Sequence, residues 1–391
     1  MDFAAGGAMK KGKLVKQENW TIFNCHVHTF TRKNVPKHIA KIQLGVVLGS
    51  VVSWLEDFKF VLKFIIWFIS KIQPERRDVL MRLERFAHTG KLSDQASVFQ
   101  KIQLQYPVGT KFIVLPMNMD HMGLGAATET IDIQHENLFQ LAKKVNSQSK
   151  RGGGDEIIYP FYTVHPDEPD IVNTARKNLG KNKFRGVKIY PNLGYSPTNK
   201  ILREIYKICE DGGYPVISHC SPTGIWKYGL READRRRLGN PENYKEVLGD
   251  FPNLHLCLAH FGGAEEWVKH LKSETPNIGP KKAWIRMITD MLSEMDNKTK
   301  KRKYPNLFTD ISYTIFTPRV PGLYIDLLDY LKVLLSNTYI RESVLFGSDF
   351  YMVEQEEISE KEASILLRSR LGEDLYKQIA YTNPKRFLGI K

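Results

Sequence analysis

The sequence lacks any run of about twenty uncharged apolar residues, the length that a membrane-spanning helix requires. Its most apolar stretch, 44–72, is interrupted by Glu56, Asp57, Lys59 and Lys63. Low-complexity segments and short-period repeats are also missing, which excludes fibrous and repeat architectures. The chain is therefore predicted to have no membrane span and to fold around a core of its own.

Cysteine is scarce, with four residues in a chain of 391 and no Cys-x-x-Cys spacing. This excludes a disulfide framework and a zinc ribbon. Residues 1–17 are small and basic, and their apolar part is too short for a signal peptide. We therefore predict a cytoplasmic protein that begins with a flexible basic tail over 1–17.

Acidic residues are fewer than basic ones, 43 against 57, which gives a net charge of +14. The two basic clusters, 231–240 and 296–305, lie apart and lack interleaved aromatic residues, so they provide no means of reading bases. We predict no nucleic-acid binding. A positive field that attracts a small anionic substrate accounts for the charge more simply.

Short apolar runs rich in β-branched residues recur along the chain and indicate strands buried on both faces of a parallel sheet. They lie at 21–28, 111–120, 157–166, 184–191, 214–220, 253–260, 307–312 and 343–349. Helical patterns separate them, for example at 136–148, 199–213 and 324–337. This alternation predicts an α/β fold, a (β/α)8 TIM barrel formed as a single domain over 18–391.

One connection is far longer than a usual loop between strand and helix, because about 80 residues separate the first two strands. We expect this insertion, 34–108, to be largely helical and to pack over the mouth of the barrel. It is interpreted as a lid or a homodimer contact. A membrane-surface role is less favoured, because lysines do not dominate a polar face there.

The first predicted strand ends in His26-Val27-His28. Alternation along a strand places His26 and His28 on one side, toward the barrel interior, and Cys25 and Val27 on the other, toward the helices. A single buried histidine is more often a structural residue than a ligand. A pair at this spacing is weak evidence for a metal site unless other strand ends supply further ligands.

Other strand ends do supply them. His219, His260 and Asp349 end later strands, and Lys188 lies near the end of the fourth. Active sites of parallel barrels form at the C-terminal ends of the strands, so these side chains should meet. Imidazoles and a carboxylate suit Zn²⁺ or another divalent first-row metal.

The chain resembles the amidohydrolase superfamily, and in particular its amidohydrolase-2 branch of metal-dependent hydrolases and related decarboxylases. The matching segments are HVH, FRGVKIYPNLGYSP, VISHC, FPNLHLCLAHFGG, DIS, LFGSDF and NPKRFLG. They run from residue 21 to 391 outside the insertion. They are specific to the superfamily but not to one reaction.

The resemblance implies metal ligation by His26, His28, His219 and Asp349, with His260 as a catalytic residue beside the metal. Asp349 is also expected to accept a proton from a metal-activated water, with His260 as acid, base or oxyanion partner. The resemblance favours one ion over two, and we expect Zn²⁺.

Lys188 is open to two interpretations: a carboxylated lysine that bridges two metals, or a cation that binds a substrate carboxylate. Weaker candidates for substrate binding follow the strands or lie in nearby loops, namely Asp120, His121, Arg185, Tyr190 and Trp226.

Three functions are compatible with these residues. The first is hydrolysis of an amide, ester or lactone of a small carboxylated molecule by a metal-activated water. The alternative is non-oxidative decarboxylation of an aromatic or unsaturated acid with the same metal set. The third is a non-enzymatic binding protein. Hydrolysis is our first prediction, although the substrate loops contain no motif that selects it.

Overall fold

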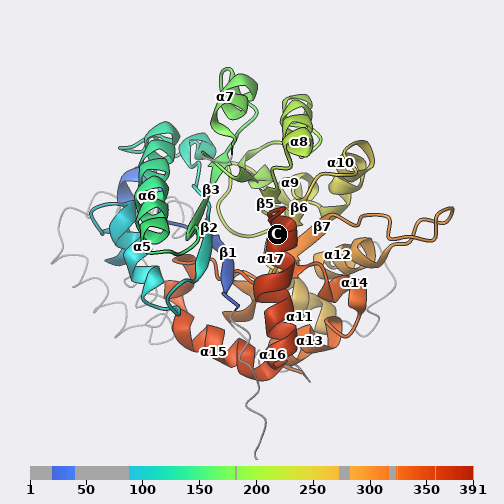
Figure 1. The fold of residues 1–391 in the computed structure, drawn as a ribbon. Coiled ribbons are helices and arrows are strands. Elements are labelled where there is room, and N and C mark those ends of the chain that lie inside the picture. Colours follow the sequence, from blue (N-terminus) through green and yellow to red (C-terminus); the bar gives the residue numbers. More distant parts are fainter. Residues whose placement is uncertain are drawn as a thin grey trace, which may run out of the picture.

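Eight parallel strands form the centre of the computed structural model, hydrogen-bonded in the order β1 to β8 (Figure 1). Their bounds are β1 Phe23–Val27, β2 Lys111–Val114, β3 Ile158–Thr163, β4 Gly186–Ile189, β5 Val216–Ser218, β6 Leu256–Leu258, β7 Leu307–Asp310 and β8 Val344–Leu345. The sheet closes because Cys25 N donates to Phe346 O at 2.8 Å and Asp349 N donates to His26 O at 2.8 Å. The predicted TIM barrel is confirmed, and each strand lies inside a predicted run.

Helices surround the barrel on its outer side (Figure 1). They are α5 Gln95–Gln103, α6 Ile131–Arg151, α7 Ile171–Asn178, α8 Lys200–Gly212, α9 Glu232–Leu238, α10 Tyr244–Asp250, α11 Ala264–Lys272, α12 Trp284–Ser293, α13 Leu327–Leu334, α14 Thr338–Arg341, α15 Glu360–Leu371, α16 Glu373–Lys377 and α17 Asn383–Phe387. The three helices predicted from the sequence correspond to α6, α8 and α13. Their apolar residues pack against the outward-facing side chains of the strands in one continuous core.

The structure describes only part of the long insertion. The described residues are 20–39, 88–180, 183–272, 282–316, 323, 325–356 and 358–390. Of the insertion 34–108 they include a short start and the segment that carries α5, whereas the apolar stretch 44–72 and the tail 1–17 lie outside them. Within the described part of the chain, no helix combines the length and apolarity that a membrane crossing needs.

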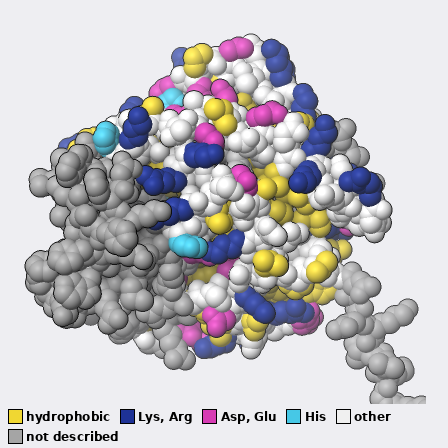
Figure 2. Space-filling model, turned by 90° about the vertical axis from the view of Figure 1, so that its left-hand side faces the viewer, with side chains coloured by type: hydrophobic (Ala, Val, Ile, Leu, Met, Phe, Trp, Pro, Cys, Tyr) yellow, Lys and Arg dark blue, Asp and Glu magenta, His cyan; other side chains and the backbone are white. Residues whose placement is uncertain are grey.

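Charged side chains of both signs are mixed over the face of the molecule shown in Figure 2. Lysine and arginine side chains lie in separate groups, with aspartate and glutamate among them. Among the described residues visible on this face, the basic side chains do not merge into a continuous stripe. This distribution agrees with a positive net charge that is spread over the surface.

A second, smaller core fills the inside of the barrel, where side chains from alternate strand positions meet. Phe23 of β1 and Phe308 of β7 lie in this core together with Phe387 and Leu388 at the end of α17. Because Phe23 and Phe308 lie near the starts of their strands, α17 covers the N-terminal opening of the barrel, which it crosses in Figure 1. Access to the inside is therefore left to the opposite end, where the strands finish.

The strand β1 departs from simple alternation. The pairing between β1 and β2 shifts register between Asn24 and Val27, which is the signature of a β-bulge. Cys25 consequently packs in the inner core, while Val27 packs in the outer one. The prediction that Cys25 faces the helices was wrong, because the extra residue of a bulge places two consecutive side chains, Cys25 and His26, toward the inside.

A buried polar network joins β1, the segment after β8 and α15. Glu360 Oε1 accepts hydrogen bonds from Tyr106 Oη at 2.9 Å and from Asn24 Nδ2 at 3.3 Å. Asn24 Nδ2 also donates to Ser348 Oγ at 2.8 Å, and Ser348 N donates to Asn24 Oδ1 at 3.1 Å. Burial raises the pKa of Glu360 to about 8. The network therefore contains a carboxylic acid that holds its proton at neutral pH.

This acid predicts a pH-dependent stability. Because the pKa of Glu360 is raised from its ordinary value of 4.5 to about 8, its stabilising effect is complete below pH 4.5 and is lost as the pH rises toward 8. We expect the free energy of unfolding to fall by on the order of 3–5 kcal/mol from this group over that range. Glu360→Gln, which cannot titrate, should lack this component. Unfolding curves of both proteins at about pH 5 and about pH 9 measure it, and equal pH dependence would contradict it.

Candidate metal centre

Seven polar side chains meet at the C-terminal end of the barrel, and none is more than 7 % exposed. They are His26 and His28 at the end of β1, Lys188 on β4, His219 after β5, His260 after β6, Asp310 on β7 and Asp349 after β8. Burial of so many ionisable groups in one place requires that they pair with one another or bind a cation.

His28 shows which of its ring nitrogens faces the centre. Its Nδ1 lies 2.7 Å from Leu115 O, and since a carbonyl only accepts, Nδ1 carries the hydrogen. The Nε2 lone pair therefore faces Asp349 Oδ1 at 3.1 Å. A lone pair and a carboxylate oxygen repel at this distance unless a proton or a metal ion lies between them.

His26 is oriented in the same way by a carboxylate. Its Nδ1 lies 2.9 Å from Asp310 Oδ2, so that nitrogen carries the hydrogen. Its Nε2 faces Lys188 Nζ at 3.4 Å and Asp349 Oδ1 at 3.7 Å. The pKa of His26 is lowered well below its ordinary value, chiefly by burial and then by Lys188 and His28. Its ring is thus neutral, which is the form that binds metals.

One ring nitrogen of His219, Nε2, donates a hydrogen bond to Thr223 O at 2.9 Å. Its Nδ1 then faces His260 Nε2 at 3.0 Å, and the ring centroid of His260 is 4.8 Å from that of His26. Burial lowers the pKa of His219 and His260 well below the ordinary value. His260 therefore lies between two neutral histidines, within reach of the centre.

The donor set fits a divalent cation. Among the described residues, one nitrogen each of His26 and His28 and one oxygen of Asp349 lie within 4.8 Å of one another. Each histidine donates its other ring N–H to an oxygen, an arrangement that orients metal ligands and raises their basicity. His219 lies outside this group of three and adjoins it through His260.

Asp310, the first residue of the DIS segment, organises the centre, although it was not among the predicted site residues. Besides His26 Nδ1, its carboxylate accepts from His260 N at 2.9 Å, Ser312 N at 3.1 Å and the Ser312 hydroxyl. Cys257 Sγ also donates to Asp310 Oδ2, at 3.7 Å. The position of Asp310, inward-facing at the end of a predicted strand, was a signal that could have identified it.

The backbone at two of these residues adopts left-handed conformations, which non-glycine residues rarely take. His260 has φ 65° and Asp349 has φ 68°. Each costs roughly 1–2 kcal/mol, a strain that proteins tolerate mainly at functional sites. Gly347 permits the turn after β8 to approach β1, since a Cβ on it would lie 2.8 Å from His26 Cβ. The strained turn is what aims Asp349 at the two histidines.

Lys188 within the centre and Tyr190 beside it were also predicted. Lys188 is fully buried beside His26, and burial lowers its pKa to about 8. The ring of Tyr190 stacks on His219 with centroids 3.9 Å apart, and its hydroxyl accepts from Ile225 N at 3.0 Å. Tyr190 therefore supports the orientation of His219.

The remaining predicted residues have other contacts. Asp120 accepts from Ile131 N at 3.1 Å at the start of α6, His121 stacks on His165 at 3.6 Å, and the guanidinium of Arg235 covers Trp226 at 4.0 Å. Arg185 precedes β4 and pairs with Glu156 at 3.2 Å. The start of β4 is at the opposite end of the barrel, so we leave Arg185 out of the proposed site. Among the described residues, these hydrogen bonds, ion pairs and ring contacts of Asp120, His121 and Trp226 do not involve the metal centre.

Comparisons with known proteins identify the family of the chain and its fold. A model of the amidohydrolase family matches residues 150–390, more than half of the chain, and the chain belongs to that family. No curated protein matches the sequence significantly. The 5-carboxyvanillate decarboxylase of Novosphingobium aromaticivorans, solved with manganese and 4-hydroxy-3-methoxy-5-nitrobenzoic acid, has a TM-score of 0.52 and 12% identity, covering 96% of this chain and 97% of that one.

Two other solved structures are similar at lower scores. The 5-carboxyvanillate decarboxylase of Sphingomonas paucimobilis has a TM-score of 0.49 and 14% identity, covering 95% of this chain and 100% of that one. The 2,6-dihydroxybenzoate decarboxylase of Rhizobium has a TM-score of 0.46 and 12% identity, covering 74% and 87%. The Novosphingobium structure, with its TM-score of 0.52 and 12% identity, establishes the shared barrel fold alone.

The prediction of hydrolysis as the first function was wrong. Two similar structures with TM-scores of 0.52 and 0.51 are of a 5-carboxyvanillate decarboxylase with bound manganese, which favours the alternative reaction. The sequence motifs contain residues that could hold a metal ion, and because such an ion suits both reactions, the motifs could not separate the two. Two similar structures with TM-scores above 0.5 contain manganese, so a divalent ion is supported whereas zinc in particular is not.

Proposed function

We propose that this protein is a metal-dependent, non-oxidative decarboxylase of a small aromatic acid. The observation that carries the proposal is the buried cluster of His26, His28 and Asp349 with the Lys188 ammonium beside it. A cationic centre attracts the substrate anion, and it stabilises the negative charge that the departing carbon dioxide leaves on the ring. The decarboxylases with the same fold support the reaction class.

In this proposal His26, His28 and Asp349 hold one divalent ion, and His219, which adjoins them through His260, is the fourth ligand. Such an ion, when bound, supplies positive charge that binds and polarises substrate oxygens. The histidine-rich donor set suits Zn²⁺, while the manganese in the similar structure makes Mn²⁺ the other candidate. Lys188 is assigned the role of a substrate-binding cation, not that of a bridging ligand.

The residues of this chain then move one proton. The bond between the ring carbon and the carboxylate carbon breaks, carbon dioxide leaves, and the electron pair remains on the ring carbon. That carbon takes up a proton from an acidic side chain of the protein. The aromatic carboxylate is thereby converted into an arene and carbon dioxide. His260 and Asp349 are the groups we assign to this transfer, since both face the centre.

The proposal predicts which products form. The metal-free protein, reconstituted with Mn²⁺ or Zn²⁺, should release carbon dioxide from hydroxylated benzoic acids and should leave matched phenyl esters and lactones intact. Carbon dioxide release and ester cleavage are measured on the same preparation, with the metal-free protein as control. Ester or lactone cleavage without carbon dioxide release would overturn the proposal, as would the absence of carbon dioxide release across the panel.

A further inference from the structure

Three side chains at alternate positions, at the end of β7 and in the turn after it, hold His260 in place. Asp310 Oδ1 accepts from His260 N at 2.9 Å, and Thr314 Oγ1 donates to His260 O at 2.7 Å. Ser312 Oγ lies 2.9 Å from the ring nitrogen Nδ1 of His260. All three residues are fully buried. They therefore contact both backbone polar groups of His260 and one of its two ring nitrogens.

The contacts of Asp310 and Thr314 are made to the backbone of His260. They stabilise its left-handed conformation, which has φ 65° and which a non-glycine residue keeps only when its surroundings support it. They do not decide how the ring is turned. The orientation of the imidazole, and the nitrogen that carries its hydrogen in the neutral form, depend on the partners of Nδ1 and Nε2.

Ser312 can only accept a hydrogen bond from the ring of His260. Ser312 Oγ donates its one hydrogen to Asp310 Oδ1, which also accepts from Ser312 N at 3.1 Å. The lone pairs of Ser312 Oγ are then left to face His260 Nδ1, and Ser312 O faces the same nitrogen at 3.2 Å. Because both oxygens are acceptors toward it, His260 Nδ1 carries the hydrogen of the ring.

The same hydroxyl oxygen also lies near His26, but that histidine has a closer acceptor. His26 Nδ1 is 2.9 Å from Asp310 Oδ2 and 3.2 Å from Ser312 Oγ. For His260 Nδ1, the nearest acceptor in the described part of the chain is Ser312 Oγ. Removal of the hydroxyl should therefore disturb the ring of His260 and leave His26 with its main partner.

The hydrogen on Nδ1 leaves the lone pair of His260 on Nε2, which faces His219 Nδ1 at 3.0 Å. His219 donates from its other ring nitrogen to Thr223 O, so its Nδ1 also presents a lone pair. If the hydrogen of His260 moved to Nε2, the two rings would form a hydrogen bond with each other. Neither of these two nitrogens would then offer a lone pair to the centre.

We propose that Ser312 is a positioning residue for the proton transfer. Its hydroxyl, which Asp310 orients, holds the hydrogen of His260 on Nδ1 and keeps Nε2 as the nitrogen that exchanges a proton. The proposal rests on the proposed function, in which His260 takes part in this transfer. Asp310 thus orients His26 by direct contact and His260 through the hydroxyl of Ser312.

Nuclear magnetic resonance of the imidazole nitrogens tests the proposal in the full-length protein loaded with Zn²⁺, which is diamagnetic. The nitrogen shifts show which ring nitrogen carries the hydrogen, and the signals of His260 are assigned by their loss in His260→Asn. We expect the hydrogen of His260 on Nδ1 in the unmodified protein and on both nitrogens in turn in Ser312→Ala, while His26 keeps its hydrogen on Nδ1.

Two results of this measurement would overturn the proposal. One is a hydrogen on Nε2 of His260 in the unmodified protein, and the other is an unchanged His260 signal in Ser312→Ala. The first needs no substitution at Ser312, so it decides the proposal even if that variant folds poorly.

Kinetics provide the second test. At saturating metal, Ser312→Ala should lower kcat for carbon dioxide release by about tenfold to a hundredfold, because His260 is no longer held in the productive orientation. KM should change by less than about twofold, since the groups that bind the substrate remain. If the unmodified protein releases no carbon dioxide, the proposed function fails, whereas the nitrogen signals still decide the role of Ser312.

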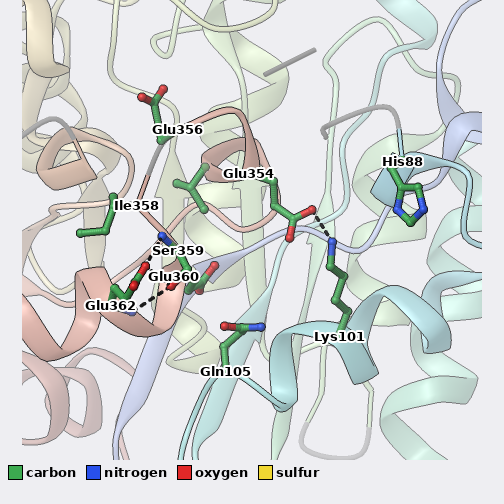
Figure 3. A pocket seen from close by; sticks show the side chains of 10 residues that line it. His88, Lys101, Gln105, Glu354, Glu356, Ile358, Ser359, Glu360 and Glu362 are labelled. Carbon is green, nitrogen blue, oxygen red and sulfur yellow. Dashed lines mark hydrogen bonds and ion pairs between the residues drawn. The ribbon is translucent and has the colours of Figure 1, made fainter. Parts of the chain in front are cut away.

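Ser359→Ala is the matched control. The hydroxyl of Ser359 likewise donates to a carboxylate and accepts from an N–H, here Glu362 Oε2 at 2.7 Å and Glu362 N at 3.2 Å, in the pocket shown in Figure 3. Loss of this helix cap should lower the melting temperature and leave kcat and the His260 signals unchanged. If Ser312→Ala behaves as this control does, its role is structural and the proposal is wrong.

Discussion

Replacement of both His26 and His28 by alanine should leave the purified protein without a bound divalent ion and reduce decarboxylation by at least about 10³-fold. The reason is that these residues supply the two nitrogen lone pairs that face Asp349, at 3.7 Å and 3.1 Å from its Oδ1. Without them a single carboxylate and His219 remain, too few to retain the metal. Elemental analysis of the dialysed protein, together with the carbon dioxide assay, measures the effect.

The matched control is His270→Ala, which removes a histidine on α11 that contacts Tyr330 at 2.8 Å, outside the centre. Its metal content and activity should equal those of the unmodified protein. Circular dichroism checks that the double variant keeps the barrel, whose outer core does not include the two histidines. Unchanged metal content in a folded double variant would refute the ligand assignment.

Asp310→Asn should lower the affinity for the metal by about 10–100-fold and also destabilise the fold. An amide has one accepting oxygen, whereas Asp310 accepts from the ring of His26, from His260 N and from Ser312. At least one buried donor is left unsatisfied, at a cost of about 1–3 kcal/mol. His26 also loses the partner that holds the hydrogen on Nδ1, so its Nε2 is no longer reserved for the metal.

Metal titration and thermal melting of this variant separate the two effects. Asp329→Asn is the control, because Asp329 pairs with Arg370 at the surface and such pairs contribute about 0–1 kcal/mol. A melting temperature lowered without any loss of metal affinity would assign Asp310 to folding alone. An affinity equal to that of the unmodified protein would exclude its role in orienting His26.

Most residues of the candidate metal centre could be predicted because each lies at or near the end of a strand that the sequence indicates. In a parallel barrel every strand ends at the same rim, so residues at the ends of predicted strands must converge even when they are hundreds of positions apart. His26, His28, Lys188, His260 and Asp349 follow this rule. The separation of His219 from the group of three could not be foreseen, since it depends on the loop that carries Thr223.

The errors also have physical causes. A β-bulge after Asn24 turned Cys25 inward, and because β1 is buried on both faces, the shift in alternation leaves no polar mark in the sequence. Arg185 and Lys188 are three positions apart on one predicted strand, yet they lie at opposite ends of it and only Lys188 reaches the rim. The choice between hydrolysis and decarboxylation depends on the substrate contacts, not on the metal-binding residues.

The sequence by itself determined the barrel, because the alternation of apolar strands and amphipathic helices allows few other ways to bury both faces of eight parallel strands. It also determined which residue types meet at the rim. Only the tertiary structure decided which nitrogen of each histidine faces inward, through Leu115 O, Asp310 and Thr223 O. It alone placed Glu360 against Asn24 and Tyr106, 336 and 254 positions away. Hydrogen-bond partners across such separations are set by packing in three dimensions, which no local pattern encodes.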